Sequence, residues 1–231
     1  MLEELKKRVF EQNVSLKKSG LVVLTWGNAS AIDREKGLVV IKPSGVPYET
    51  MKAEDMVVVD AKTGKVVEGK YKPSSDLPTH LYLYENFLKI KGVVHTHSTY
   101  SVAWAQSGKD IPVFGTTHAD AFYGNVPCTR ALTKEEVESE YELNTGKVIV
   151  ERFSGIDYNA IPAVIAKNHG PFTWGETVES AVKYAETLEE VAKMALLTKQ
   201  INENAQTIEQ HLLDKHYFRK HGKNAYYGQK D

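Results

Sequence analysis

The sequence predicts an α/β fold in which a largely antiparallel sheet is covered by helices on both faces. Short segments rich in β-branched residues fill the front of the chain, and the longest helical pattern lies toward its end. Only a few residues separate the first strand-like segments, and such short connections favour antiparallel hairpins. Because strands and helices each bury an apolar face, a sheet with helical layers on both sides is the simplest arrangement.

The first third of the chain contains one predicted helix and three predicted strands. In residues 2–18 the apolar side chains recur at helical spacing, and Gly20 supplies a C-terminal stop. The segments 21–26, 38–43 and 56–60 are short apolar runs separated by turn-forming residues. That pattern is typical of neighbouring strands in one sheet.

Helix and strand patterns alternate in the middle of the chain. Residues 77–89 have a helical pattern with Pro near the first turn, and they lead into a predicted strand at 91–98. Thr133 and Glu136 have the spacing of a capping box. This spacing predicts a helix through 134–142.

The last third contains a buried strand and the longest helix. Residues 161–170 form an apolar run that ends in Gly, and residues 176–200 carry an apolar stripe at helical spacing. We find no repeat, linker or low-complexity segment that would divide the chain. We therefore predict one domain over residues 1–231, a length that allows a sizeable core.

The composition excludes several classes of protein. The 29 Lys and Arg nearly balance the 30 Asp and Glu, so nucleic acid and anionic membranes are not indicated as partners. The single cysteine, Cys128, forms no internal disulfide and leaves no Cys-rich zinc motif, which fits a reducing compartment. No segment has the pattern of a signal peptide or the roughly 20 apolar residues of a spanning helix. We expect a cytoplasmic protein.

The segment "GVVHTHS" at residues 92–98 indicates a metal site. On a strand, side chains two residues apart share one face, so His95 and His97 are expected to point together. Neutral imidazoles are good ligands for zinc. A chain with eight histidines can also contain such a pair by coincidence, so the pair needs further ligands to carry weight.

Two other residues supply that ligand set. His169 follows the predicted strand in "KNHGPF", before an expected Gly-Pro turn, and Asp76 precedes a helix in "KPSSDLPTH". Three histidines and one carboxylate are a ligand set typical of catalytic zinc, which keeps a position open for substrate. On sequence grounds His80 and His118 compete as ligands, so these alternatives stay open.

Three small-polar turns are suited to binding a phosphate group. They span residues 25–30, 42–45 and 72–76, and each combines Gly or Ser backbone amides with a hydroxyl or an amide side chain. Two of them also carry a lysine. Backbone N–H groups of such turns bind anions, although ordinary turns have the same composition.

The C-terminal tail, at about residues 214–231, interleaves basic and aromatic residues. A solvated tail rarely contains as many aromatic residues as this one does. We expect it to dock on a neighbouring subunit through its aromatic residues, which are Tyr217, Phe218, Tyr226 and Tyr227.

Taken together, these motifs resemble the class II (zinc-dependent) aldolase and epimerase family over essentially the whole chain. The resemblance is carried by "LTWGN", "IKPSGV", "MVVVD", "KPSSDLPTH", "GVVHTHS", "GTTHAD", "YGNVPCTR", "NHGPF" and "DKHYFRKHGKNAYYGQ". It implies a three-layer αβα sandwich around a central, largely antiparallel sheet. It also implies a homotetramer with active sites between subunits and one zinc ion per subunit.

The resemblance also implies roles for individual residues. It assigns the zinc ligands to Asp76, His95, His97 and His169. It places the sugar-phosphate substrate against Gly27, Asn28, Ser44, Gly45, Ser74 and Ser75, with Lys42 nearby. It makes Asp120 and Tyr227 the proton-transferring pair, with Tyr227 contributed by the adjacent subunit and with His216 and Arg219 in support.

Within the family, the motifs indicate the epimerase branch. Relatives that resemble fuculose-phosphate aldolase carry a glutamate where this chain has Asp76, and the "AYYGQ" segment points the same way. The segment between Glu151 and His169 is slightly short for the family, and "KNHG" replaces a more histidine-rich approach to the third ligand. The implied activity inverts C4 of L-ribulose 5-phosphate to give D-xylulose 5-phosphate, as in arabinose catabolism or the ascorbate and xylulose routes.

The implied chemistry is a retro-aldol and aldol sequence, because the C4 proton is two bonds from the ketone and is not acidic. Breaking the C3–C4 bond leaves an enediolate, which a divalent metal stabilises. Three alternatives are an aldolase that releases the aldehyde, a metal hydrolase and a protein without catalytic activity. A hydrolase barrel would need regular strand–helix alternation, which the clustered hairpins do not fit.

Overall fold

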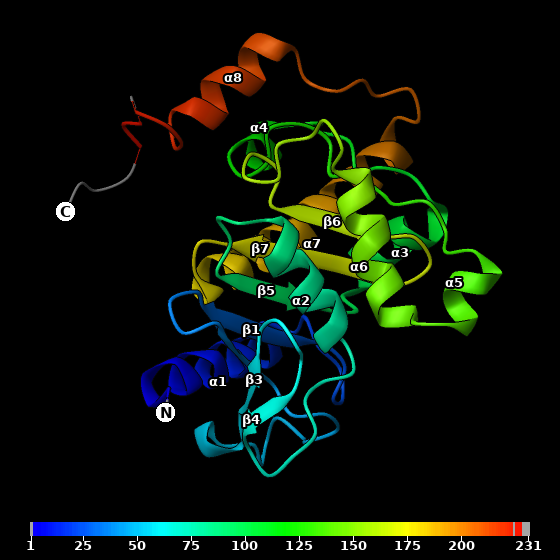
Figure 1. Ribbon diagram of the computed structural model, residues 1–231. Helices are drawn as coiled ribbons and strands as arrows, with labels where there is room; N and C mark the ends of the chain where they lie inside the picture. Colours follow the sequence, from blue (N-terminus) through cyan, green and yellow to red (C-terminus); the bar gives the residue numbers. More distant parts are fainter. Residues whose placement is uncertain (1, 224, 228–231) are drawn as a thin grey trace.

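The computed structural model describes residues 2–223 and 225–227, and its centre is one antiparallel sheet (Figure 1). In this part of the chain the sheet has seven strands in the order β4-β3-β2-β1-β5-β7-β6, and every neighbouring pair is antiparallel. The strands are β1 (Asn28–Asp33), β2 (Leu38–Ile41), β3 (Val57–Asp60), β4 (Val66–Glu68), β5 (Gly92–His95), β6 (Ala163–Ala166) and β7 (Gly170–Gly175).

Helices pack on both faces of this sheet, which gives the three layers expected from the sequence (Figure 1). One face packs against α2 and α6, and the other packs against α1 and the first half of α7. The helices are α1 (Glu3–Lys18), α2 (Leu77–Asn86), α3 (Thr99–Ser107), α4 (Thr116–Ala119), α5 (Lys134–Glu138), α6 (Tyr141–Arg152), α7 (Val178–Ile201) and α8 (Gln210–Phe218), with a 3₁₀ turn η1 (Ala53–Asp55).

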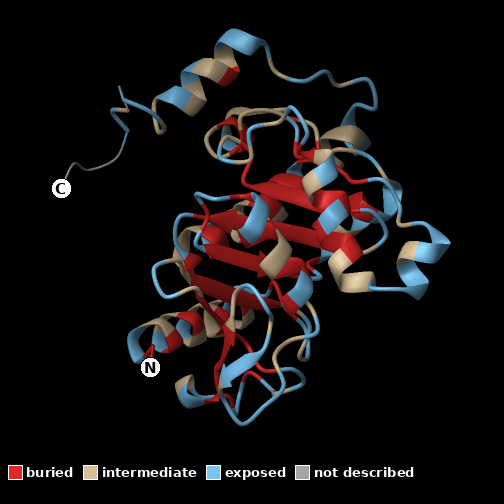
Figure 2. Cartoon of the chain, viewed as in Figure 1, coloured by how far each residue is buried: buried red, intermediate tan, exposed pale blue. Residues whose placement is uncertain are grey.

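The double covering explains why the strands are apolar throughout instead of alternating with polar residues. Val39 and Ile41 of β2 lie in the core beneath α2, whereas Val40 lies in the core beneath α1. Successive side chains point to opposite faces, so a strand buried on both sides needs apolar residues at every position. Figure 2 shows the consequence, since the central strands are coloured as buried along their length.

The predicted strand at 21–26 is wrong, and the strand that follows it begins at Asn28. Leu21 and Val22 are buried, but Val23, Leu24 and Trp26 are exposed. Leu24 has φ +53°, and the backbone amide of Trp26 donates to the Val23 carbonyl, so the chain turns here. The apolar run therefore connects α1 to β1 instead of pairing within the sheet.

Two further boundaries differ from the sequence prediction. The predicted strand at 161–170 is split, because Asn168 has φ +64° in a turn that joins β6 to β7. The expected Gly-Pro turn is wrong, since Gly170 and Pro171 begin β7. Thr133 does cap a helix, with Glu136 completing the capping box, but this helix ends at Glu138 and α6 starts at Tyr141.

Within the described residues, every helix is too short or too polar to pass through a lipid bilayer.

Candidate active site

His95 is fixed at the end of β5 by contacts on two sides of its ring. Its Nδ1 lies 2.9 Å from the carbonyl oxygen of Pro171, and the ring stacks on Phe172 with centroids 4.2 Å apart. A carbonyl can only accept, so Nδ1 carries the hydrogen and Nε2 keeps its lone pair. His95 is 1% exposed, so β7 holds this nitrogen in one position from the buried side.

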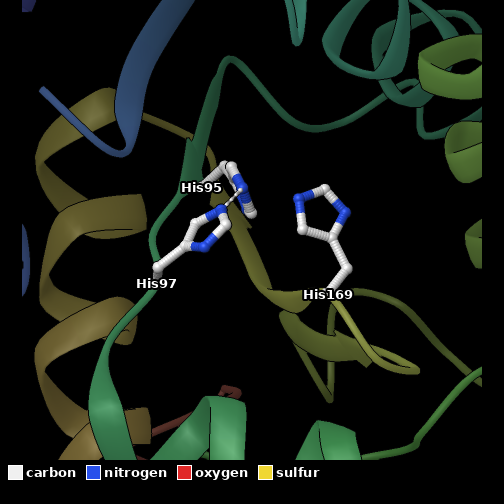
Figure 3. A group of neighbouring side chains, drawn as sticks. All are labelled: His95, His97 and His169. Carbon is white, nitrogen blue, oxygen red and sulfur yellow. Dashed lines mark hydrogen bonds between the residues drawn. The ribbon is translucent and has the colours of Figure 1, made fainter.

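His97 lies beyond the end of the strand, yet its ring meets that of His95 (Figure 3). The Nε2 atoms of the two rings are 3.0 Å apart. The two-residue period of a strand therefore does not by itself account for this meeting, because β5 ends at His95. His97 is exposed to solvent and lies beside Trp26, with ring centroids 6.3 Å apart. The site is open on this side.

His169 completes the cluster from the turn between β6 and β7. Its ring centroid lies 4.6 Å from that of His95 and 5.2 Å from that of His97. Its Nδ1 lies 3.4 Å from the Tyr141 hydroxyl. Burial, together with the neighbouring His95, lowers the pKa of His169 to about 3. The ring is therefore neutral, which is the state that binds a metal.

These three histidines form a site that fits a metal ion, and we call them the histidine site. One ligand nitrogen from each ring lies within 4.8 Å of the other two, and Figure 3 shows the rings facing one another. Neutral nitrogen ligands brought together at a solvent opening suit a transition-metal ion. The predicted convergence of His95, His97 and His169 is thus confirmed.

Asp76 lies next to the histidine site but outside the group of atoms within 4.8 Å, which among the described residues contains histidines only. The side-chain amide of Asn28 donates to its Oδ2 at 2.6 Å. Burial alone would raise the pKa of Asp76, but the neighbouring imidazoles of His95 and His80 and the hydrogen bond from Asn28 bring it below its ordinary value. Its carboxylate is therefore ionised beside the cluster.

The competing histidines have other partners. Nδ1 of His80 lies 2.7 Å from the Ser30 hydroxyl, and Nε2 of His118 lies 2.8 Å from the carbonyl of Gly124. Both rings are buried, and neither belongs to the group of converging ligand atoms. The structure thus separates them from the histidine site, which the sequence did not.

The three small-polar turns meet one another beside Asp76. The backbone amide of Ser74 donates to the Lys42 carbonyl and that of Ser44 donates to the Lys72 carbonyl, each at 2.9 Å. The Asn28 amide reaches the Ser74 hydroxyl at 3.0 Å. The remaining predicted substrate residues, Gly27, Gly45 and Ser75, lie in the same turns.

Gly27 is required at its position by the backbone of β5. Its φ is +89°, and a Cβ there would lie 2.9 Å from the carbonyl oxygen of His95. This close approach brings the first turn directly against the end of the strand that carries His95. The predicted phosphate turns and the histidine site are thus parts of one region.

Lys42 has a buried ammonium group beside the small-polar turns, which the sequence alone does not reveal. Its side chain is buried, and Nζ donates to the carbonyls of Pro43 and Val46 at 3.3 and 3.2 Å. Burial lowers the pKa of Lys42 to about 8. Nζ also lies 4.7 Å from the centre of the Tyr48 ring, and a buried ammonium with these partners beside Ser44 is suited to pairing with an anion.

Asp120 lies in a second group of residues, at the end of α4. Its carboxylate is 3.0 Å from His216 Nδ1, 2.7 Å from Arg219 Nη2 and 3.0 Å from Lys220 Nζ. Burial alone would raise the pKa of Asp120, but hydrogen bonds from Arg219, Lys220 and His216 lower it to about 2. No sequence motif indicates a role for Lys220, which follows Arg219 and is partly buried.

Tyr227 lies over the same cations, so we call this group of Asp120, His216, Arg219, Lys220 and Tyr227 the tail cluster. The Tyr227 ring is 4.7 Å from Arg219 and 4.5 Å from Lys220. No hydrogen bond, ion pair or ring contact of the described residues joins the tail cluster to the histidine site. In Figure 1, α4 and α8 lie beyond the β6 edge of the sheet.

The predicted tail at about 214–231 therefore begins inside α8. Residues 224 and 228–231, which include part of the "AYYGQ" segment, lie outside the described residues. The remainder packs on α4 of its own chain through the tail cluster and through Leu213, which contacts Val113 and Ala119.

The similarity of this chain to known proteins extends over nearly its whole length. Residues 7–196 match the family model described as the class II aldolase and adducin N-terminal domain. Proteins named L-ribulose-5-phosphate 4-epimerase UlaF, from Salmonella paratyphi A and Salmonella typhi, are 58% identical over 229 residues. Those residues are 99% of this chain and 100% of each relative.

Solved structures have the same fold. An L-fuculose 1-phosphate aldolase matches with a TM-score of 0.78 and 28% identity, covering 92% of this chain and 94% of that one. The L-fuculose 1-phosphate aldolase from Glaciozyma antarctica matches with a TM-score of 0.77 and 22% identity, covering 96% and 84%. The predicted α/β class and antiparallel sheet are confirmed.

Proposed function

Because this chain belongs to the class II aldolase and adducin family, we propose that it acts as an L-ribulose-5-phosphate 4-epimerase. The reaction inverts C4 of L-ribulose 5-phosphate and gives D-xylulose 5-phosphate. The observation that carries this conclusion is the histidine site, in a chain that matches epimerases of that name over its full length. The substrate is accordingly a sugar phosphate.

Zinc is the ion that we propose for the histidine site. His95, His97 and His169 would hold it, with Asp76 as the fourth protein ligand. The donor set supports this assignment, because three neutral nitrogens and one carboxylate suit a catalytic zinc ion. A bound zinc ion supplies Lewis-acid stabilisation of negative charge at the C2 and C3 oxygens of the substrate.

The three small-polar turns would bind the phosphate end of the substrate. Gly27, Asn28, Ser44, Gly45, Ser74 and Ser75 provide backbone amides, hydroxyls and one side-chain amide. Lys42 provides the balancing charge, since its buried ammonium group donates only to carbonyls of the same loop. Firm binding of the phosphate matters because the aldehyde fragment made by C3–C4 cleavage must stay in the site while its carbonyl group turns over.

Proton transfer falls to Asp120 and Tyr227 in this proposal. The C4 oxygen loses a proton on one face of the aldehyde and regains one on the other, so two groups are needed. The low pKa of Asp120 keeps it ionised at neutral pH, and it can accept a proton. Arg219 and Lys220 lie over the Tyr227 ring, where they stabilise negative charge that develops on its oxygen.

A homotetramer would bring these two parts together. The tail cluster and the histidine site of one chain are not in contact, so a second copy has to place its tail cluster, with Asp120 and Tyr227, beside the first copy's metal ligands. The exposed Trp26 beside His97, together with the exposed Leu24 in the same segment, supports an interface there.

The decisive experiment follows the stereochemistry at C4 by NMR after incubation with L-ribulose 5-phosphate. We expect an equilibrium mixture with D-xylulose 5-phosphate and no free aldehyde. Stoichiometric release of glycolaldehyde phosphate without xylulose phosphate would instead identify an aldolase. Metal analysis of freshly purified protein tests the zinc assignment, and we expect about one ion per chain.

A further inference from the structure

Two matching contacts join β1 to α2 directly behind the histidine site. Asn28 and Ser30 are two residues apart on β1 and share one face. Asp76 and His80 are one helical turn apart, and the backbone amide of His80 donates to the Asp76 carbonyl. Asn28 bonds to Asp76, and Ser30 bonds to His80, so the two contacts lie side by side.

The hydrogens in the Ser30 contact can be assigned from the groups around it. Among the described residues the buried Tyr84 hydroxyl has one side-chain hydrogen-bond partner, the Ser30 hydroxyl at 2.8 Å, so Tyr84 donates its hydrogen to Ser30. Ser30 then donates to Nδ1 of His80 at 2.7 Å. Because Nδ1 accepts, the neutral ring of His80 carries its hydrogen on Nε2.

Two buried atoms beside these contacts remain without a protein partner. The amide nitrogen of Asn28 donates to Asp76 and Ser74, which uses both of its hydrogens. Among the described residues, Asn28 Oδ1 and His80 Nε2 are the buried side-chain atoms without a hydrogen bond. One is an acceptor and the other a donor, and leaving either unpaired costs about 1–3 kcal/mol.

Asn28 Oδ1 and His80 Nε2 belong to neighbouring contacts, and one accepts while the other donates, so a single partner could bond to both. Asn28 is 2% exposed and His80 is 0% exposed, so bulk solvent does not supply it. A water molecule that accepts from Nε2–H and donates to Oδ1 would satisfy both atoms, as buried waters do. Each group would then donate a hydrogen bond to the next, from Tyr84 through Ser30, His80, the water molecule and Asn28 to the Asp76 carboxylate.

We propose that Ser30 and His80 are positioning residues for Asp76, acting through one buried water molecule and the side chain of Asn28. This inference rests on the proposed function of Asp76 as a metal ligand. This series of hydrogen bonds fixes the orientation of the Asn28 amide, because a flipped amide would turn its oxygen toward the Asp76 carboxylate. Asp76 is thereby held at one place beside the three histidines.

The test compares Ser30→Ala with Thr173→Val. Each variant loses one buried hydroxyl: that of Ser30 bonds to His80 and Tyr84, whereas that of Thr173 on β7 donates to the Ala181 carbonyl, away from Asp76. We would measure Zn²⁺ affinity by competition with a chromogenic chelator and record the visible spectrum of the Co²⁺-loaded protein. Ser30→Ala is expected to bind Zn²⁺ about 10-fold more weakly and to shift the Co²⁺ bands.

Thr173→Val is expected to lower stability as well, while keeping the wild-type affinity and spectrum. His80→Phe, which lacks both ring nitrogens, should weaken Zn²⁺ binding about as much as Ser30→Ala, and the double variant should be no weaker. If His80→Phe does not fold, Ser30→Ala decides the matter alone.

Wild-type affinity and spectrum in folded Ser30→Ala would overturn the proposal. A crystal structure without a water molecule within hydrogen-bond distance of both atoms would overturn the water link. Both metal measurements are made without substrate. A wild-type protein that binds Zn²⁺ but does not epimerise L-ribulose 5-phosphate would therefore contradict the proposed function alone.

Discussion

The histidine site and the tail cluster both gather ionisable side chains, but they are held together in opposite ways. His95 is anchored to the sheet by a stacked Phe172 ring and a backbone carbonyl. Asp120 is held by cationic side chains that belong to the last part of the chain. The first arrangement depends on the hydrophobic core, and the second depends on charge.

This difference predicts how firmly each group is held. Side chains of the Asp120 ion pairs are between 16% and 30% exposed, and within α8 only Leu213 is buried. Exposed ion pairs contribute little free energy, so α8 is expected to detach long before the sheet unfolds. If the proposed tetramer completes each site with such a tail, substrate can exchange without disturbing the metal ligands.

The largest effect is expected from removing a ligand of the rigid site. His95→Ala should lower Zn²⁺ affinity by more than about 100-fold and epimerase activity by about 1,000-fold, because charge on the enediolate loses its stabilisation. Metal content and turnover measure the two effects. His118→Gln is the control, since His118 is also buried but bonds to the Gly124 carbonyl. Equal metal loss in both variants would contradict the assignment of His95.

The next largest effect concerns the tail cluster and leaves the metal in place. Tyr227→Phe is expected to lower turnover about 100-fold or more with unchanged Zn²⁺ content, because only proton transfer is lost. Tyr226→Phe is a closely matched control, since both tyrosines are 58% exposed and Tyr226 lies over Lys215 instead. If the two variants are equally active, Tyr227 has no part in the reaction.

The sheet and the histidine site are predicted from the sequence better than the tail cluster is. The doubly buried strands and the convergence of His95, His97 and His169 follow from apolar runs and ligand chemistry. The strand at 21–26 was misassigned because an apolar connection and a strand have the same composition. The tail cluster depends on charges far apart in sequence, such as Asp120 and Lys220, so no local pattern reveals it.

Lys42 offers a further comparison, because among the described residues this buried cation pairs with no carboxylate, whereas Arg219 and Lys220 pair with Asp120. Its folded pKa of about 8 is below its ordinary 10.5, so the folded state disfavours the charged form. This cost is complete below pH 8 and is relieved as pH rises toward 10.5. The unfolding free energy of the wild type, relative to Lys42→Met, should therefore rise across that range.

Denaturant unfolding at several pH values measures this difference for substrate-free protein. The same variant should raise KM for L-ribulose 5-phosphate about 10-fold or more, since a charged partner of the phosphate is removed. Lys70→Met is the control, because Lys70 is exposed and pairs with Asp55. A constant difference between wild type and Lys42→Met from pH 8 to 10.5 would show that Lys42 is not perturbed by burial.

The smallest effect is expected from a single cation of the tail cluster. Lys220→Met removes one of the three side chains that bond to the Asp120 carboxylate, and Arg219 and His216 remain. Because the pair is partly exposed, the loss should be below about 1 kcal/mol and should shrink as salt is added. Amide hydrogen exchange in α8 measures it, since this helix is expected to open locally.

The pH dependence of the Lys220→Met effect on α8 opening shows whether Lys220 acts through its ion pair with Asp120 or through packing of its side chain. The folded pKa of Asp120, about 2, lies below its ordinary 3.8, so its pairing stabilises the docked tail above pH 3.8. This stabilisation disappears as pH falls from 3.8 toward 2. Wild type and Lys220→Met should therefore converge in α8 exchange at the acid end of that range. A difference that persists there would mean that the Lys220 side chain holds the tail by packing, and the charge-held description of the tail cluster would fail at this residue.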